Sequence, residues 1–258
     1  MALTSKQILY IEDVIRDSLR DKFLNYKPES INMPFHYRLL GKDRMSLYSF
    51  MQSLNTTFGT SIFEPAAVAL AKLRFKDAKR SVIAGTQISE EAHKVIQTIM
   101  DGLITGQEDP NKAEEIERIR VVCQNGKMNT VKPAKVDVLV VSKDDSIYLF
   151  DIKTVKPNMG DFQKFKRTLL EWVAAVFAQN PNAKINTCLA IPYNPYEPKP
   201  YRRWTMKGML DFDSELKVAD EFWDFLGGKG SYNELLNCFE RVGIELRPEI
   251  DEYFSKFK

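Results

Sequence analysis

The sequence predicts a mixed α/β fold, in which a mixed central sheet is flanked by helices. Two β-rich runs, 135–143 and 146–153, are joined by a pair of aspartates, which is a hairpin signal. An amphipathic helical pattern follows over 161–179, and another β-rich run follows over 184–192. Helical patterns precede and follow this block, and the resulting order of elements is typical of a sheet whose faces are covered by helices.

The N-terminal part is expected to be mainly helical. Apolar residues recur at helical spacing over 5–25. Glu64-Pro65 opens a strong helix that is expected to reach about residue 80, since a proline in the first turn of a helix costs no hydrogen bond. The other elements expected here are helices over 44–54 (capped by Asp43), over 89–105 and from Pro110, a strand over 118–124, and loops over 26–42 and 55–61.

The C-terminal part begins with a loop over 193–204 that is rich in proline and tyrosine. Two helices are expected after it, one over 213–226 that ends at a Gly-Gly pair and one over 231–242. The chain shows no internal repeat, no low-complexity tract and no linker, so a single domain over residues 1–258 is expected.

Composition excludes several classes of protein. The chain has 258 residues and a formal net charge of +2, with 44% hydrophobic and 28% charged residues, which is ordinary for a globular protein. No apolar run approaches the roughly 20 residues that a membrane span needs, so no membrane association is expected. Cys123, Cys188 and Cys238 are far apart and odd in number, which fits a reducing cytoplasm. The only two histidines, His36 and His93, give no basis for a zinc motif.

Charge is distributed unevenly along the chain. Residues 153–207 contain ten Lys and Arg residues and three acidic residues, whereas residues 208–258 contain twelve acidic residues and six basic ones. A basic middle next to an acidic tail suggests one surface that meets a polyanion and another that does not. Random clustering of charges on solvated faces is the alternative.

The feature that points to chemistry is a pair of aspartates on the two strands of the predicted hairpin. Asp137 interrupts an otherwise apolar strand, and Asp151 and Lys153 lie two residues apart near the end of the partner strand, so they project from the same face. Carboxylates and water are the ligands that Mg²⁺ prefers, and an ammonium group can stabilise the charge that develops on a phosphate. The pattern therefore predicts Mg²⁺-assisted phosphodiester hydrolysis, with Mn²⁺ as a substitute metal.

Each of these residues also has an explanation without catalysis. Asp and Lys are common at strand ends, where Asp151 and Lys153 would form an ion pair. Glu64, a third carboxylate upstream, stands in the first turn of a predicted helix, where it complements the helix dipole. Asp137 is harder to explain in this way, because an unpaired charge in a buried strand is costly.

The arrangement Asp137 and then Asp151-Ile152-Lys153 resembles the motif of the PD-(D/E)xK nuclease superfamily, whose core is a helix, three strands, a helix and a strand. One position departs from that motif, since Val136 rather than proline precedes Asp137. The position is loose within the superfamily, and the aspartate at 151 is within the motif.

Two longer segments make the resemblance more specific. Residues 54–71 and 191–210 resemble type II restriction endonucleases of the TdeIII-like group, and the likeness covers about residues 45–230. It implies a restriction-endonuclease-like α/β fold with a nuclease core over about 60–195 and helical additions at both ends.

The resemblance also implies roles for individual residues. Asp137 and Asp151 would bind the metal together with the carbonyl of Ile152. Lys153 would serve the attacking water, and Glu64 would be the helix carboxylate that completes the catalytic site. Mg²⁺ is the cofactor that this residue set implies.

The loop and the helix around the motif are predicted to contact DNA. An arginine can donate two hydrogen bonds to O6 and N7 of guanine, which is the commonest specific base contact. Lysines are better suited to phosphates, which give affinity without sequence information. The predicted DNA-binding residues are Lys156, Lys164, Lys166, Lys199, Tyr201, Arg202, Arg203, Trp204 and Lys207. A solvated basic loop anchored by its tryptophan is the alternative.

The sequence therefore predicts a cytoplasmic restriction endonuclease that cuts double-stranded DNA at a short palindrome, and the family resemblance implies that it leaves 5′-phosphate ends. The TdeIII-like resemblance suggests a target of the GGNCC kind. A repair or junction-resolving nuclease on the same core and a non-catalytic DNA-binding module are the alternatives. A homodimer is expected, because the chain has one Asp…Asp-x-Lys constellation and a palindrome presents the same half-site twice.

Overall fold

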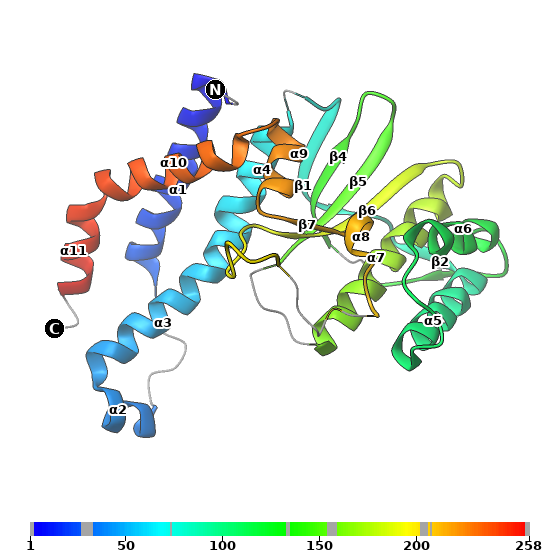
Figure 1. Cartoon of the computed structure of the whole chain (residues 1–258), viewed down its shortest axis with the longest axis horizontal. Helices are drawn as coiled ribbons and strands as arrows, with labels where there is room; N and C mark the ends of the chain where they lie inside the picture. The colour runs from blue at the N-terminus through cyan, green and yellow to red at the C-terminus, as the bar shows by residue number, and fades with distance from the viewer. Residues whose placement is uncertain are drawn as a thin grey trace.

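A five-stranded mixed sheet forms the centre of the molecule (Figure 1). The computed structural model describes residues 3–26, 33–72, 74–132, 135–153, 159–201, 206 and 208–255. In sheet order the strands are β1 (Asp77–Ile83), β4 (Lys135–Val141), β5 (Ser146–Ile152), β6 (Lys184–Ile191) and β7 (Leu216–Val218). β1, β4 and β5 pair antiparallel, and β5, β6 and β7 pair parallel, so the predicted mixed sheet is confirmed.

Four helical segments lead into the sheet. α1 (Ser5–Asn25) begins at a capping box, which gives partners to orphan N–H groups of its first turn. α2 (Pro34–Leu40) and α3 (Lys42–Thr57) follow, and α3 continues through a π-helical segment, η1 (Phe58–Phe63), into α4 (Glu64–Ala71). Figure 1 shows α3 and α2 leading away from the sheet, whereas α4 lies beside it.

Helices cover both faces of the sheet. One face packs against α5 (Glu90–Thr105), α6 (Lys112–Val122) and α7 (Met159–Gln179). The other face packs against α1, α4, α9 (Asp220–Gly227) and α10 (Ser231–Glu245). β6 is therefore buried along most of its length, as expected for a central strand with parallel neighbours.

The order α4, β1, β4, β5, α7, β6 matches the helix, three strands, helix and strand that the resemblance implies. α5 and α6 are inserted between β1 and β4, together with a small two-stranded sheet. The small sheet consists of β2 (Gln87–Ser89) and β3 (Met128–Thr130). The C-terminal part also contains α8 (Phe212–Glu215) and α11 (Arg247–Ser255). Among the helices described, none has both the length and the apolar character that a membrane span requires.

The local predictions around the hairpin are confirmed. The helix expected over 5–25 is α1, the helix expected from Ser89 is α5, and the helix and strand expected after the hairpin are α7 and β6. The Ser89 side chain accepts a hydrogen bond from the Ala92 N–H, which is the N-cap contact that its position predicts.

Two predicted elements are wrong in type. The strand expected over 118–124 belongs to α6, where the Asn111 side chain caps the helix and Glu115 and Ile119 are buried on one side of it. The helix expected up to residue 80 ends with α4, and the helix-favouring residues after it form β1. Pairing with β4 outweighs their intrinsic propensity, which is a weak preference.

Four further predictions are also corrected. The loop expected over 26–42 contains α2, and the loop expected over 55–61 is helical, because a π-helical bond from the Glu64 N–H to the Gly59 carbonyl continues the chain. The expected capping residue Asp43 lies inside α3, which Gly41 precedes. The single helix expected over 213–226 is divided into α8, β7 and α9, since β7 pairs with β6.

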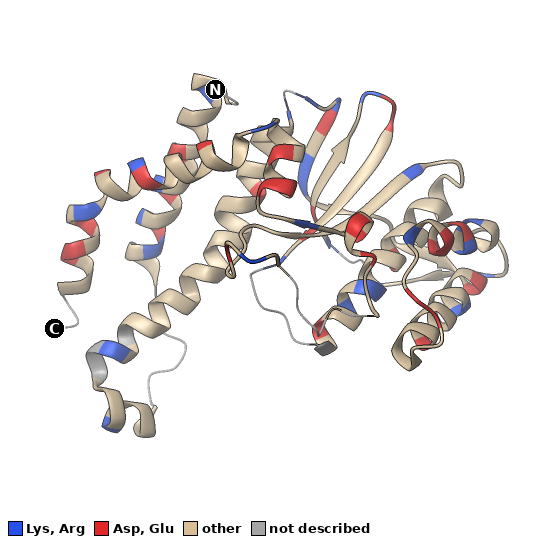
Figure 2. Ribbon diagram, viewed as in Figure 1, with Lys and Arg blue, Asp and Glu red and all other residues tan. Residues whose placement is uncertain are grey.

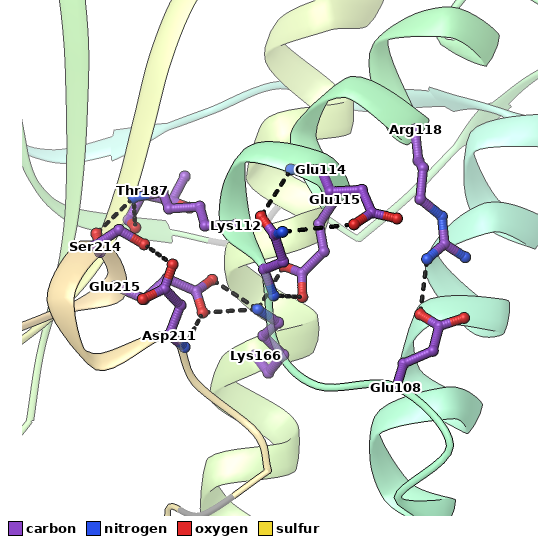
Figure 3. A network of polar contacts seen from close by, with 11 residues as sticks. Glu108, Lys112, Glu114, Glu115, Arg118, Lys166, Thr187, Asp211, Ser214 and Glu215 are labelled. Atoms are coloured by element: carbon purple, nitrogen blue, oxygen red, sulfur yellow. Dashed lines mark hydrogen bonds and ion pairs between the residues drawn. The ribbon is translucent and has the colours of Figure 1, made fainter.

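A buried ionic network joins the elements at one side of the sheet (Figure 3). The Lys166 ammonium on α7 lies 2.5 Å from a Glu115 carboxylate oxygen on α6 and 2.7 Å from one of Glu215 on α8. Lys112 donates to the backbone carbonyls of Thr187, on β6, and Ser214. The two lysines and two glutamates balance each other in charge, and each has nearly all its surface buried.

We predict that Lys166→Ala strongly destabilises the protein. Removing one partner of a buried ion pair leaves the carboxylates uncompensated, and the expected loss is about 3–5 kcal/mol of unfolding free energy. Lys164→Ala, an exposed lysine on the same helix, is the matched control and should change stability by no more than about 0.5 kcal/mol. Chemical denaturation measures both variants. Equal free energies of unfolding for the two variants would contradict a stabilising role of the Lys166 ion pairs.

Candidate active site

The two aspartates of the predicted motif lie on adjacent antiparallel strands. Val138 of β4 pairs with Phe150 of β5, and beyond this pair the carboxylate of Asp137 accepts a hydrogen bond of 2.8 Å from the Ile152 N–H. This contact brings the Asp137 side chain to the end of β5, where Asp151 lies. The hairpin therefore places the two carboxylates beside each other.

Lys153 contacts Asp151 directly. Its ammonium lies 2.5 Å from a carboxylate oxygen of Asp151, and its backbone N–H donates to the Ala190 carbonyl of β6 at 2.9 Å. Asp151 is buried, whereas the Lys153 side chain keeps 33% of its surface exposed. The expectation that these two side chains share a face of the strand is confirmed, and the charged end of Lys153 faces the boundary with solvent.

Glu64 approaches the hairpin from α4. Only 2% of its surface is exposed. One carboxylate oxygen accepts a hydrogen bond of 3.0 Å from the Ser81 hydroxyl on β1, and the other lies 3.7 Å from the Lys135 ammonium on β4. Its position at the start of α4 is the predicted one, and its contacts extend across the sheet to two strands.

The electrostatics of these carboxylates are coupled. Burial raises the pKa of Asp151 to about 6; the nearby Lys153 opposes this rise and the charge of Asp137 adds to it. Burial also raises the pKa of Glu64, and the charge of Asp137 is the next cause. Asp137 thus acts on both other carboxylates, and the site concentrates negative charge in a poorly solvated place.

This donor set fits a divalent cation. Asp137 and Asp151 repel each other electrostatically, and a cation between them would relieve that repulsion; carboxylate and carbonyl oxygens are ligands that Mg²⁺ accepts. Across the described part of the chain, no three or more His, Cys, Asp and Glu side chains are grouped so that they could hold a metal ion. A cation here would need a backbone carbonyl, such as that of Ile152, or water in addition to the two carboxylates.

The structure describes four of the nine residues predicted to contact DNA. Lys164 on α7 and Lys199, in the loop after β6, are exposed. Tyr201 is largely buried and its ring packs near that of Tyr196, with ring centroids 5.8 Å apart, so the predicted contact of Tyr201 with DNA is corrected to a packing role. The residues that lie outside the described part of the chain are Lys156, Arg202, Arg203, Trp204 and Lys207.

The expectation that Lys166 contacts a DNA phosphate is corrected. Its side chain has no exposed surface, and its ammonium is held by Glu115 and Glu215. Helical spacing explains the difference, because Lys166 lies on the inward face of α7 while Lys164 lies on the outward face. A count of lysines along the sequence could not distinguish the two faces.

Acidic residues lie beside the loop that follows β6. Figure 2 shows acidic residues on α8 and α9. A hollow of about 770 Å³ between this loop and those helices is lined by both signs of charge. Its acidic lining residues are Glu197, Asp213, Asp220, Glu221 and Asp224, and its basic ones are Lys199 and Lys229. This side of the loop therefore repels a phosphate backbone.

Sequence reasoning missed two residues that contact Glu64. Ser81 directly follows the segment that the sequence predicts to be helical, so nothing indicated that it would face the site. Lys135 is the first residue of β4, and no sequence motif indicates that it would contact Glu64. Only the pairing of β1 with β4 brings both side chains to Glu64.

Comparison with known proteins gives one family over nearly the whole chain. A family model described as "Type II restriction endonuclease, HinfI" matches residues 3–243. The chain is 27% identical to the type II restriction enzyme HgiCII of Herpetosiphon aurantiacus over 221 residues, which is 84% of this chain and 80% of that protein. It is 25% identical to the type II restriction enzyme MjaII of Methanocaldococcus jannaschii over 265 residues, covering 92% of this chain and 70% of that protein.

The family given by the comparison agrees with the resemblance to type II restriction endonucleases that the sequence motif carries. The narrower likeness to the TdeIII-like group stays a prediction. The five-stranded mixed sheet flanked by helices is consistent with the fold of these enzymes.

Proposed function

The chain belongs to the HinfI family of type II restriction endonucleases, and from this membership and the site geometry we propose that Asp137, Asp151 and Lys153 carry Mg²⁺-dependent cleavage of double-stranded DNA. The observation that carries the proposal is the convergence of two carboxylates and one ammonium at adjacent strand ends. Mn²⁺ is a substitute metal of the same ligand preference. The enzyme would act in the cytoplasm as part of a restriction–modification system.

Each residue has a distinct task in this proposal. Asp137 and Asp151 would hold the cation together with the carbonyl of Ile152. The chemistry that Mg²⁺ supplies when bound is polarisation of the scissile phosphate and a lower pKa for an attacking water. Lys153 would orient that water and stabilise the negative charge that develops on the phosphate.

Burial makes these tasks more effective. Asp151 and Glu64 are almost without exposed surface, so water competes little with their interactions. Electrostatic interactions are stronger in such a place than in bulk solvent. The ammonium of Lys153 is preorganised by its 2.5 Å contact with Asp151, and therefore needs little rearrangement to meet a phosphate beside it.

Recognition is proposed to come from the loop after β6. Arg202 and Arg203 are adjacent and suited to guanine, and the proposed target is a short palindrome of the GGNCC kind. The acidic hollow covers one side of this loop, so DNA would approach from the other side. Lys164 is exposed on α7 and would contact phosphates, whereas Lys199 lies on the side of the loop that lines the acidic hollow.

We predict that DNA cleavage requires Mg²⁺ or Mn²⁺ and stops with EDTA. Lys153→Ala should lower the single-turnover cleavage rate by about 10²–10³, because a preorganised positive charge is removed, while DNA binding survives. Lys184→Ala is the matched control, since Lys184 is an exposed lysine at the opposite end of the same sheet. Full activity in the Lys153 variant would reject the assignment.

A second prediction concerns base recognition. Arg202→Ala or Arg203→Ala should weaken binding of cognate DNA by about 1–3 kcal/mol and relax specificity at one base position, because a bidentate contact with guanine is lost. Lys164→Ala should instead weaken binding to every sequence and reduce the salt dependence. Binding titrations on cognate and random duplexes at several salt concentrations separate the two effects. Equal losses on both duplexes in the arginine variants would count against this loop as the reader.

A third prediction concerns assembly. One site cuts one strand, whereas two chains related by a two-fold axis would present two sites to the two halves of a palindrome. We expect a homodimer on cognate DNA and cleavage of both strands in one binding event. Light scattering of the DNA complex gives the stoichiometry. One chain per duplex, with nicked plasmid as the main product, would refute the dimer and leave the nuclease proposal intact.

A further inference from the structure

Ser81 has an unusual backbone conformation at a position that faces the proposed site. Its φ is +56°, in the left-handed region that a residue with a side chain seldom adopts. In the pairing of β1 with β4, Arg80 lies opposite Val138 and Val82 lies opposite Val136. Ser81 is therefore opposite Asp137, the carboxylate that acts on both other acids of the site.

The other left-handed positions have ordinary explanations. Among the described residues other than glycine, a positive φ occurs at Ser81, Asp145 and Ala219. Asp145 lies in the tight turn between β4 and β5, and Ala219 lies at the N-cap of α9. Ser81 lies inside a strand, where no turn or cap requires this conformation. Strain of this kind persists where the surroundings impose it, and it concentrates at functional sites.

The side chain of Ser81 has a specific contact. Its hydroxyl donates a hydrogen bond of 3.0 Å to Glu64, whose surface is 2% exposed. The other partner of Glu64 given by the structure is Lys135, at 3.7 Å and with 51% of its side chain exposed. The hydroxyl is thus the nearer partner, and a hydrogen bond to an ionised acceptor is a strong one.

We propose that Ser81 is a positioning residue for the nuclease reaction, whose left-handed backbone turns its hydroxyl to hold the Glu64 carboxylate beside Asp137. The inference rests on the proposed function and on the part that the sequence resemblance implies for Glu64, the helix carboxylate that completes the catalytic site. It adds the residue that orients this carboxylate. Ser81 acts through Glu64 and needs no contact with DNA or metal.

The backbone and the hydroxyl of Ser81 can be changed separately. Ser81→Gly removes the hydroxyl and relieves the strain, because glycine adopts a positive φ without steric cost. Ser81→Thr keeps the hydroxyl and increases the strain, because a β-branched residue is poorly tolerated there. Ser81→Ala removes the hydroxyl and leaves the strain in place.

We expect the more stable variant, Ser81→Gly, to lose turnover and the less stable variant, Ser81→Thr, to keep it. Ser81→Gly should melt about 2–4 °C higher than Ser81→Ala, while both lose roughly 10–100-fold in kcat, as for loss of a residue that orients a ligand. Ser81→Thr should melt lower than the parent and keep kcat within about threefold, since the donor is retained. KM should change little in all three, because the contact does not involve DNA.

Asp145→Gly is the matched control. It relieves a left-handed backbone conformation in the β4–β5 turn and removes an exposed ion pair with Lys76 that contributes little, so it should leave kcat unchanged and keep the melting temperature within about 2–4 °C of the parent. Thermal unfolding gives the melting temperature of every variant, and steady-state cleavage over a range of concentrations of one duplex gives kcat and KM. A wild-type kcat in Ser81→Ala and Ser81→Gly would overturn the proposal, and so would a kcat in Ser81→Thr as low as in Ser81→Ala when all three variants are folded.

Glu64→Gln separates this inference from the proposed function. If Glu64→Gln keeps full activity, the catalytic role of Glu64 fails, and this inference fails with it. If Glu64→Gln is impaired, adding Ser81→Ala to it should cause no further loss, because Ser81 acts through Glu64. A further loss of tenfold or more in the double variant would overturn the positioning role while leaving Glu64 in the proposed function.

Discussion

Beyond the Val138–Phe150 pair, the connection between β4 and β5 continues through a side chain, because the Asp137 carboxylate accepts the Ile152 N–H. The contact that closes the end of the hairpin is therefore also the contact that sets Asp137 beside Asp151. The register between β4 and β5 therefore determines whether the site can form. A slip of one residue would turn Asp151 to the other face of the sheet and would separate the acids that the site brings together.

Two groups of buried charge show how differently the fold treats ionisable residues. In the network of Lys112, Lys166, Glu115 and Glu215, the Lys166 ammonium lies between the two carboxylates and the Lys112 ammonium donates to backbone carbonyls. The formal charges of the four residues balance, and the network joins four elements. The group around Asp137 is not balanced in this way: three carboxylates, those of Asp137, Asp151 and Glu64, lie near the two ammonium groups of Lys153 and Lys135. The charge of Asp137 adds to the rise that burial causes in the pKa of Asp151 and of Glu64. Uncompensated charge in a poorly solvated place is costly to the fold, and such sites are where function concentrates.

The parts of the site that the sequence predicts are those with short-range patterns. The hairpin, its apolar alternation and the two-residue spacing of Asp151 and Lys153 are visible within twenty residues. β1 is not visible in this way, because the residues Asp77–Ile83 favour a helix and only their pairing with β4, more than fifty residues later, makes them a strand. The prediction for Lys166 is wrong for a related reason. Periodicity gives the faces of α7, but it cannot say which lysine contacts Glu115 and Glu215.

The edge position of β1 links the strained residue to the rest of the fold. An edge strand exposes unpaired backbone groups that invite pairing with another chain, and native proteins interrupt such edges with charges and local distortions. On β1, Lys79 and Arg80 are both exposed, and the left-handed Ser81 follows them. The same distortion that makes the edge a poor template also turns a hydroxyl toward Glu64. One local departure from strand geometry thus interrupts the exposed edge and, in the role proposed for Ser81, orients a buried carboxylate.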